Sequence, residues 1–332
     1  YTKGNSAGSG AYRVTSWKPG VEVVYERFDN WKGGPLPKLK RVVWRTIPSA
    51  GNRRALMERG DADVSFDLPS KDFAELKADG KVNVVSTPIG NGIYYLGMNV
   101  KNPPFDNEKL RHAVAYALPY QKIMDAAMFK LAKPMFGADT NQVQSTDWPQ
   151  PHAYNTNLDK AKALMAEAGF GEGIDTTLSF DLGQGVVSEP IAILIQENLK
   201  QIGINATINK VPGANWRSEM AKKSLPMMVN FFSGWLDYPE YFFFWCYHGQ
   251  NAIFNTMSYQ DAEMDKFITN ARFAESKAIY DDQVRGMIRK AFADMPRVPL
   301  FQPTQDVAMQ KNISGFTYWF HLQPDYRQIV KN

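Results

Sequence analysis

The sequence predicts an α/β protein that is built from two lobes. Strand and helix patterns alternate over residues 39–66 and again over residues 158–211, which is the order expected of α/β units. The chain of 332 residues is long enough to bury the cores of two domains. Hydrophobic residues make up 44% of the sequence and charged residues 22%, proportions that are typical of a globular protein and exclude a mostly disordered one.

The first lobe opens with a predicted hairpin. Residues 11–25 contain two runs of strand-forming residues, separated by the turn Lys18-Pro19-Gly20. A strand over residues 39–47 then leads into a helix that ends at Gly60, because glycine commonly follows the last helical residue. A strand pattern resumes over residues 61–66, and this order of strand, helix and strand predicts an α/β lobe.

A second lobe begins at the turn Ile89–Gly92, which precedes a strand over residues 94–99. The elements expected next are a helix over 107–118, a helix over 158–169, a strand over 176–181, a helix over 189–202, a strand over 204–211 and a long helix over 259–293. The apolar segment 298–301 and a strand over 307–318 then predict a return to the first lobe.

Charge and hydropathy exclude two classes of partner. The 38 basic residues exceed the 34 acidic residues by a net charge of +4, and they are scattered, without the stripe that phosphate binding needs. We therefore expect no nucleic acid partner. The longest aromatic and apolar run, Tyr241–Tyr247, is far shorter than the roughly 20 residues that cross a bilayer, so no segment is expected to span a membrane.

No local motif indicates a catalytic, cofactor or metal site. The glycine cluster Gly169–Gly173 follows a predicted helix, whereas a phosphate loop precedes one. The histidines lie far apart and show no metal-ligand spacing: His112, His152, His248 and His321. Cys246 is the only cysteine, so we expect it to be a small core residue with no intrachain disulfide. Catalysis stays a minority interpretation, because a nucleophile and a base from distant segments could still meet in space.

The most informative segment is Phe231–Tyr241, in which Asp237 follows a predicted strand among aromatic residues. A carboxylate that loses hydration needs a cationic or hydrogen-bonding partner, and the ammonium group of a ligand would supply one. Such a pair is much stronger in a low-dielectric cleft than at the surface. The alternative interpretation is that Asp237 only starts a turn before Pro239.

Several motifs lie in a fixed order along nearly the whole chain. They are Gly8–Tyr12, Asn30–Gly33, Arg54–Leu56 with Gly60–Asp63, Tyr95–Asn99 with Pro104–Asp106, Leu110–Ala117, Asp159–Phe170 and Leu199–Ile204. In this order they resemble the peptide and nickel class of ABC-transporter solute-binding proteins, known as solute-binding protein family 5. The most specific part is Pro104-Phe105-Asp106 followed by Leu110–Ala117, which is similar to the family's Pro-Phe-x-Asp and Val-Arg-x-Ala-Leu-x-Tyr-Ala stretch.

The segment Trp235–Pro239 is similar to the family's Trp-x-x-Asp-Tyr segment, whose aspartate pairs with the terminal amine of a bound peptide in peptide-binding members. The resemblance implies that Asp237 holds a ligand cation, that Trp235 and Tyr238 give apolar walls, and that Gly234 lies beside them. One residue of the family pattern is missing between Trp235 and Asp237.

The resemblance also implies that Tyr94 and Tyr95 line the ligand site on the side where the chain crosses between lobes. Dipeptide binders of the family carry an arginine for the ligand carboxylate before the helix over 189–202, but residues 182–187 contain none. Longer peptides, opines, oligosaccharides, nickel complexes and other cationic solutes therefore stay open.

The fold implied by the resemblance is a two-lobe periplasmic-binding-protein, or venus-flytrap, architecture with mixed sheets flanked by helices. Lobe I would comprise residues 1–88 and 301–332 and would be discontinuous in sequence, and lobe II would comprise residues 89–300. Hinges are expected near residues 87–94 and 295–301. A ligand would enter an open cleft, and both lobes would close over it.

The implied function is that of the substrate-binding component of an ABC importer, with the permease and ATPase subunits as partners. It would be periplasmic, or an extracellular lipoprotein tethered to the membrane of a Gram-positive cell. The chain opens at Tyr1 without a signal peptide, so we expect a processed or truncated chain whose incomplete first lobe lacks an N-terminal segment. Such a lobe should expose a sheet edge or an apolar patch. An enzyme or a signalling sensor on the same scaffold stays an alternative.

Overall fold

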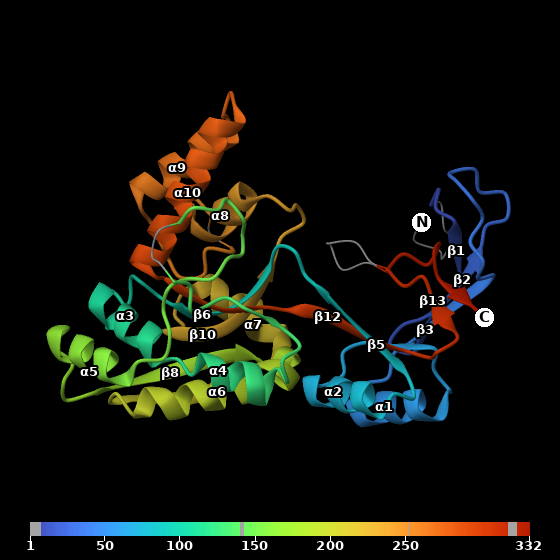
Figure 1. The fold of residues 1–332 in the computed structure, drawn as a ribbon, viewed down its shortest axis with the longest axis horizontal. Coiled ribbons are helices and arrows are strands. Elements are labelled where there is room, and N and C mark those ends of the chain that lie inside the picture. The colour runs from blue at the N-terminus through green and yellow to red at the C-terminus, as the bar shows by residue number, and fades with distance from the viewer. Residues whose placement is uncertain (1–7, 140–142, 252, 318–323) are drawn as a thin grey trace. The chain divides into compact units, whose positions relative to one another are not determined.

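The computed structural model describes residues 8–139, 143–251, 253–317 and 324–332. Within these residues the chain forms two compact units, one from residues 1–87 together with 305–332 and the other from residues 88–304 (Figure 1). We call them unit 1 and unit 2. The chain leaves unit 1 at the end of β5 (Asn83–Pro88) and returns to it at the start of β12 (Thr304–Met309).

Unit 1 contains three small sheets and two short helices in its described part. Its elements are β1 (Tyr12–Lys18), β2 (Glu22–Arg27), β3 (Arg41–Arg45), α1 (Ala50–Arg59), β4 (Val64–Ser65), α2 (Ser70–Asp79), β13 (Ile313–Ser314) and β14 (Val330–Lys331), in addition to β5 and β12. The strands form sheets in the orders β1-β2-β3, β4-β12-β5 and β13-β14. The hairpin predicted around Lys18-Pro19-Gly20 is confirmed by the antiparallel register of β1 and β2.

Local sequence explains why α1 has these bounds. The Ser49 side chain accepts a hydrogen bond from Asn52 N at the start of the helix. Gly60 adopts the left-handed conformation with φ 79°, and its N–H donates to Leu56 O and Met57 O, so the helix ends where the sequence predicted. Arg54 then forms ion pairs with Asp72 and Glu75 of α2, which fixes the two helices together.

One face of the β1-β2-β3 sheet exposes large apolar side chains. Trp17 is paired with Val23 and Val23 with Trp44 across neighbouring strands, so these side chains lie on the same face. Trp17 is 70% exposed and Trp44 is 45% exposed. An apolar patch on unit 1 was expected from the sequence, and the described residues contain one.

Unit 2 is organised around a six-stranded mixed sheet within its described residues. In spatial order the strands are β7 (Lys133–Pro134), β11 (Arg297–Gln302), β6 (Gly92–Met98), β10 (Met227–Ser233), β8 (Ile174–Asp181) and β9 (Ile204–Val211). Strands β8, β9 and β10 run parallel to one another, and β6 is antiparallel to both β10 and β11.

Helices cover both faces of this sheet (Figure 1). The helical elements are α3 (Glu108–Ala117), α4 (Tyr120–Lys122), the π-helix η1 (Ile123–Ala127), α5 (Leu158–Glu167), the 3-10 helix η2 (Leu182–Gln184), α6 (Gly185–Lys200), α7 (Gly213–Lys222), α8 (Pro239–Tyr247), α9 (Ala262–Arg272) and α10 (Lys277–Asp294). Apolar residues of α3, α5 and α6 form one hydrophobic cluster, and those of α8, α9 and α10 form another.

All residues of β6 are buried, because the strand is packed on both faces. Alternate residues point to opposite sides, so Tyr94 belongs to the cluster with α6 and Tyr95 to the cluster with α8. The ring of Tyr94 stacks against Phe231 and Phe301, with centroids 5.4 and 4.9 Å away. β6 is therefore the centre of unit 2.

The single helix predicted over residues 259–293 is wrong. The structure has two helices, α9 and α10, because the sequence contains two helix starts in this stretch. Asp261 accepts a hydrogen bond from Met264 N at the start of α9, and Ser276 accepts one from Ile279 N at the start of α10. The lysine and aspartate pattern continues through both helices and conceals the break.

The predicted strand over 307–318 is also wrong in its extent. β12 ends at Met309, and Ile313 N donates to Gln310 O in a turn before β13. Residue 318 lies outside the described residues. The sequence patterns did not predict α2, α7 or α8, which have no long apolar stripe along one face.

The α/β fold with mixed sheets flanked by helices is confirmed. Cys246 is buried, as expected of a core residue. Among the described residues, no helix combines the length and the apolar character that a membrane crossing requires.

Candidate functional site

The candidate site is the edge of the unit 2 sheet at which the parallel strands β8, β9 and β10 end. We call it the carboxyl edge. The helices that follow these strands begin there: α6 after β8, α7 after β9 and α8 after β10. Helix N-termini carry unpaired N–H groups and a partial positive charge, so this edge gathers directed polar groups.

The chain reverses its direction of travel across the sheet at β8. It passes through α6 to β9 on one side of β8, and then returns through α7 to β10 on the other side. Helix α6 packs with Met227 and Val229 of β10, whereas Trp216 of α7 packs with Met228, so the two helices cover opposite faces. In open α/β sheets, ligands bind at the carboxyl ends of the strands where such a reversal occurs.

The segment 234–238 connects β10 to α8 at this edge and is open to solvent. Trp235 is 77% exposed, Tyr238 is 60% exposed, and Asp237 is exposed between them. Leu182 and Val186, at the start of η2 and α6, are also large exposed apolar residues. Exposed apolar side chains at the carboxyl ends of the strands indicate a candidate binding surface.

Buried contacts hold the base of segment 234–238. The side chain of Asn91 donates hydrogen bonds from Nδ2 to Gly234 O at 2.9 Å and to Leu236 O at 2.8 Å. Gly234 is buried, and a Cβ atom at this position would lie 2.9 Å from the ring of Tyr241, so only glycine fits without displacement. Gly90 lies beside Asp237: a Cβ atom on Gly90 would lie 3.4 Å from Asp237 Oδ2, an ordinary contact distance.

Three acidic residues, Asp181, Asp237 and Glu240, lie at the end of β8, after the end of β10 and in the first turn of α8. Among the described residues, no ion pair reaches the carboxylate of Asp237. Asp181, at the end of β8, accepts a hydrogen bond from Gly183 N at 2.8 Å. Desolvation raises the pKa of Glu240 above its ordinary value, and Arg272 opposes this shift. The exposed carboxylate of Asp237 could therefore pair with a positively charged group of a ligand.

The predicted site residues fall into distinct positions. Gly234, Trp235, Asp237 and Tyr238 are together on one segment. Tyr94 is buried below this edge, where its hydroxyl bonds to Ser188 and desolvation raises its pKa to about 12. Tyr95 points to the other face of the sheet, where Arg297 lies 4.6 Å from its ring centroid. Both tyrosines are thus core residues of unit 2.

Sequence reasoning missed Asn91. It lies in the turn Ile89–Gly92, where the pair Asn-Gly indicates only a turn. Its role depends on contacts with residues 143 and 145 positions away in the sequence. No local pattern could have identified these contacts.

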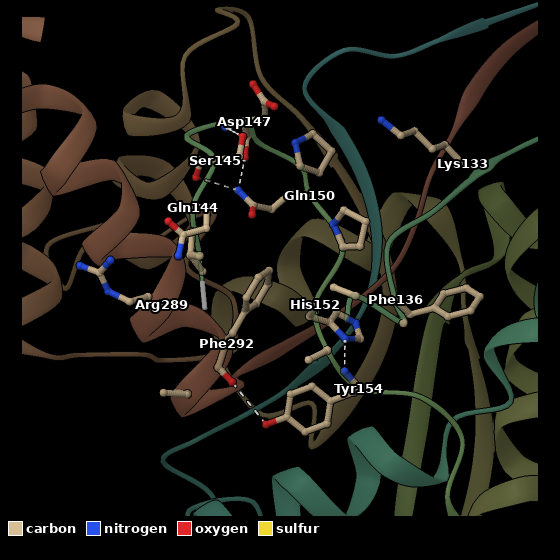
Figure 2. Close-up of a pocket in the computed structure, with 17 residues that line it drawn as sticks. Lys133, Phe136, Gln144, Ser145, Asp147, Gln150, His152, Tyr154, Arg289 and Phe292 are labelled. Atoms are coloured by element: carbon tan, nitrogen blue, oxygen red, sulfur yellow. Dashed lines mark hydrogen bonds between the residues drawn. The ribbon is translucent and has the colours of Figure 1, made fainter. Parts of the chain in front are cut away.

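A separate cavity of about 610 Å³ lies in unit 2 (Figure 2). Aromatic and proline side chains form part of its wall, including Phe136, Tyr154 and Phe292, and charged groups of Lys133, Asp147 and Arg289 also line it. None of the predicted site residues lines this cavity. Across the part of the chain that the structure describes, no group of three or more His, Cys, Asp or Glu side chains is placed to hold a metal ion.

His152 lines this cavity and is almost fully buried (Figure 2). Its Nε2 lies 2.8 Å from Pro299 O, and its Nδ1 accepts a hydrogen bond from Tyr154 N at 3.2 Å. Nε2 therefore carries the proton of a neutral ring. Desolvation lowers the pKa of His152 from 6.5 to about 4.

The buried, neutral His152 predicts a loss of stability in acid. Between about pH 6.5 and pH 4 the unfolded chain binds a proton at this residue and the folded chain does not, so the free energy of unfolding falls as the pH falls through this window. The contribution lost by pH 4 is about 3 kcal/mol. Urea unfolding of the wild type and of His152→Gln at a series of pH values measures it. A variant with the same pH slope as the wild type would contradict this assignment.

Comparison with known proteins gives a family match. The model of "Bacterial extracellular solute-binding proteins, family 5 Middle" matches residues 1–254. A curated relative, the glutathione-binding protein GsiB of Pectobacterium atrosepticum, is 27% identical over 328 residues, which cover 96% of this chain and 62% of the relative. This chain thus spans about 62% of the length of the curated relatives it matches.

Solved structures show the same fold. The periplasmic binding protein DppA from Helicobacter pylori, in complex with the peptide STSA, has a TM-score of 0.83 at 19% identity, covering 98% of this chain and 63% of that chain. The oligopeptide-binding protein AppA from Bacillus subtilis, in complex with a nonapeptide, has a TM-score of 0.78 at 25% identity, covering 98% of this chain and 67% of that chain.

Proposed function

Because the chain belongs to family 5 of the bacterial extracellular solute-binding proteins, we propose that it captures a small peptide or peptide-like cationic solute for an ABC importer. The observation that carries this proposal is the carboxyl edge, where exposed Trp235 and Tyr238 flank the exposed carboxylate of Asp237. The glutathione-binding relative and the similar solved structures in complex with the peptide STSA and with a nonapeptide support a peptide-like ligand.

The proposed recognition uses one charged contact and apolar walls. The ammonium group of the solute pairs with Asp237, and its apolar portions contact Trp235 and Tyr238. Gly234 allows the segment to pack against Tyr241, because the Cβ atom of any other residue there would collide with the ring of Tyr241. Binding rather than chemistry is the proposed activity, in agreement with a family of solute-binding proteins.

We propose that units 1 and 2 are the two lobes of a venus-flytrap protein. The expected hinges, near residues 87–94 and 295–301, lie close to the points where the chain passes between the units. In this proposal a bound solute favours the closed form, and the closed form docks on the permease, which works with an ATPase subunit. The proposed location is outside the cytoplasmic membrane, either periplasmic or tethered as a lipoprotein.

The exposed face of the β1-β2-β3 sheet supports a further partner. Trp17 and Trp44 would be covered by polypeptide that corresponds to the part of the relatives' length outside this match. Acrylamide quenching of tryptophan fluorescence tests this, because added polypeptide from that part should shield Trp17. Quenching that stays unchanged in a chain extended to the relatives' length would contradict it.

Calorimetric titration tests the proposed function. The probes are glutathione, the tetrapeptide Ser-Thr-Ser-Ala and the same tetrapeptide with an acetylated N-terminus. We expect at least one free peptide to bind, and the acetylated peptide to bind more weakly because it has no ammonium group. Equal affinity for the free and acetylated peptides would contradict the proposed role of Asp237, and no binding of any of the three probes would contradict the peptide assignment.

A further inference from the structure

The turn Ile89–Gly92 lies at a junction of three segments of unit 2. It comes directly after Pro88, the first residue of the unit. Ile89 N donates to Pro303 O at 3.0 Å, next to the residue at which the chain leaves the unit again. The turn also leads into β6. Its last residue, Gly92, is the first residue of β6 and pairs with Ser233 at the end of β10.

Two buried side-chain amides connect this junction. Gln302 of β11, 6% exposed, donates from Nε2 to Ile89 O at 3.0 Å and to Gly90 O at 2.7 Å. Asn91, 3% exposed, donates from Nδ2 to Gly234 O and Leu236 O. Each side-chain amide thus donates to two backbone carbonyl groups of a segment that is distant in the sequence.

The orientation of the Asn91 amide is fixed by its surroundings. Both hydrogen-bond partners of its Nδ2 are carbonyl oxygens, which accept hydrogen bonds and cannot donate them. A flipped amide would place Oδ1 against these carbonyls and would lose both hydrogen bonds. Asn91 Oδ1 is buried without a hydrogen-bond partner among the described residues, so the donating side of the amide provides its contacts.

We propose that Gln302 and Asn91 form an amide relay that couples the two chain crossings to the ligand-contacting segment 234–238. This inference rests on the proposed function, in which segment 234–238 contacts the ligand. The hydrogen bonds that form the relay lie within the chain and do not involve a ligand. A shift of the backbone at residues 88–91 displaces the carbonyls held by Gln302 and moves Asn91, which in turn moves Gly234 and Leu236. Asn91 and Gln302 are thus positioning residues for Asp237 and Trp235.

Hydrogen exchange of the ligand-free chain tests the relay. The Gln302→Ala substitution removes side-chain hydrogen bonds only to Ile89 and Gly90. The relay nevertheless predicts that hydrogen exchange becomes about tenfold faster both in peptides that cover 89–92 and in peptides that cover 234–238. Asn91→Ala should accelerate exchange of the same segments. Asn91→Ser, a smaller change in polarity, is the second variant if Asn91→Ala does not fold.

Two variants control for the loss of a side-chain amide that donates to backbone carbonyls. Gln310→Ala removes hydrogen bonds to Met57 O and Ala62 O in unit 1. Asn99→Ala removes a hydrogen bond to Lys223 O and one from Lys101 N, just beyond the other end of β6. Both should leave exchange at 234–238 unchanged. Faster exchange at 89–92 alone in Gln302→Ala would overturn the relay, and so would equal acceleration of 234–238 in the controls.

A second measurement connects the relay to binding. The probe is whichever of glutathione and Ser-Thr-Ser-Ala binds the wild type. Asn91→Ala should speed its dissociation about tenfold. In an Asp237→Asn background the same substitution should have a much smaller effect, because both changes act on one contact. Additive effects in this cycle would overturn the positioning role. If neither probe binds the wild type, the proposed function fails, while hydrogen exchange still decides the relay.

Discussion

Replacing Asp237 with asparagine is expected to weaken binding of a cationic solute by about 1.5–3 kcal/mol, roughly one to two powers of ten in affinity. The substitution keeps the shape of the side chain and removes the charge that faces the ligand ammonium group. Asp237 has no ion pair with a described residue that would compensate within the chain, so the loss should appear in ligand binding rather than in folding. Calorimetry with the free tetrapeptide and urea unfolding measure the two quantities.

The control for this prediction is Asp147→Asn. Asp147 is an exposed acidic residue of unit 2 that lines the separate cavity and lies on another loop. It changes the net charge of the chain by the same amount, so any general electrostatic effect appears in both variants. Unchanged affinity in Asp237→Asn, or an equal loss in Asp147→Asn, would leave Asp237 as a residue that only starts the turn before α8.

The second large effect is expected at Tyr94. Tyr94→Ala should lower the free energy of unfolding by about 3–5 kcal/mol, because it leaves a cavity in the core. The ring is 5% exposed and is stacked between Phe231 and Phe301. Denaturant unfolding followed by circular dichroism measures the change.

Tyr94→Phe separates the two roles of this residue. It keeps the stacked ring and removes the hydroxyl group that bonds to Ser188, so a cost of about 0.5–1.5 kcal/mol in stability is expected. A stability loss below about 1 kcal/mol in Tyr94→Ala would contradict its place in the core. A loss of affinity in Tyr94→Phe that exceeds the loss of stability would show that the hydroxyl also contacts the ligand.

The parts of the fold that the sequence predicted are those with local signals. The turn Lys18-Pro19-Gly20 and the helix end at Gly60 depend on residues that favour one backbone conformation. The break between α9 and α10 was missed because Ser276, which caps the start of α10, lies in a continuous pattern of charged residues. Helix α8 was missed because its run of aromatic residues has no periodic polar face.

The candidate site was only partly predictable for a related reason. Asp237 and Trp235 are neighbours in the sequence, so one segment contains the chemistry that a ligand would contact. Asn91 and Gln302 act on carbonyls of segments between 143 and 213 positions away, and only the paired strands β6, β10 and β11 bring them together. Adjacent tyrosines in a strand point to opposite faces, so Tyr94 and Tyr95 pack into different hydrophobic clusters.

Native mass spectrometry of the purified protein, followed by denaturation, tests most directly whether the chain holds a peptide-like solute at Asp237 without changing it. We expect a complex of one chain with one small molecule, release of that molecule as an intact compound with a free amine, and little or no complex in Asp237→Asn. Release of a chemically altered product, or equal occupancy in the wild type and Asp237→Asn, would contradict binding through this carboxylate.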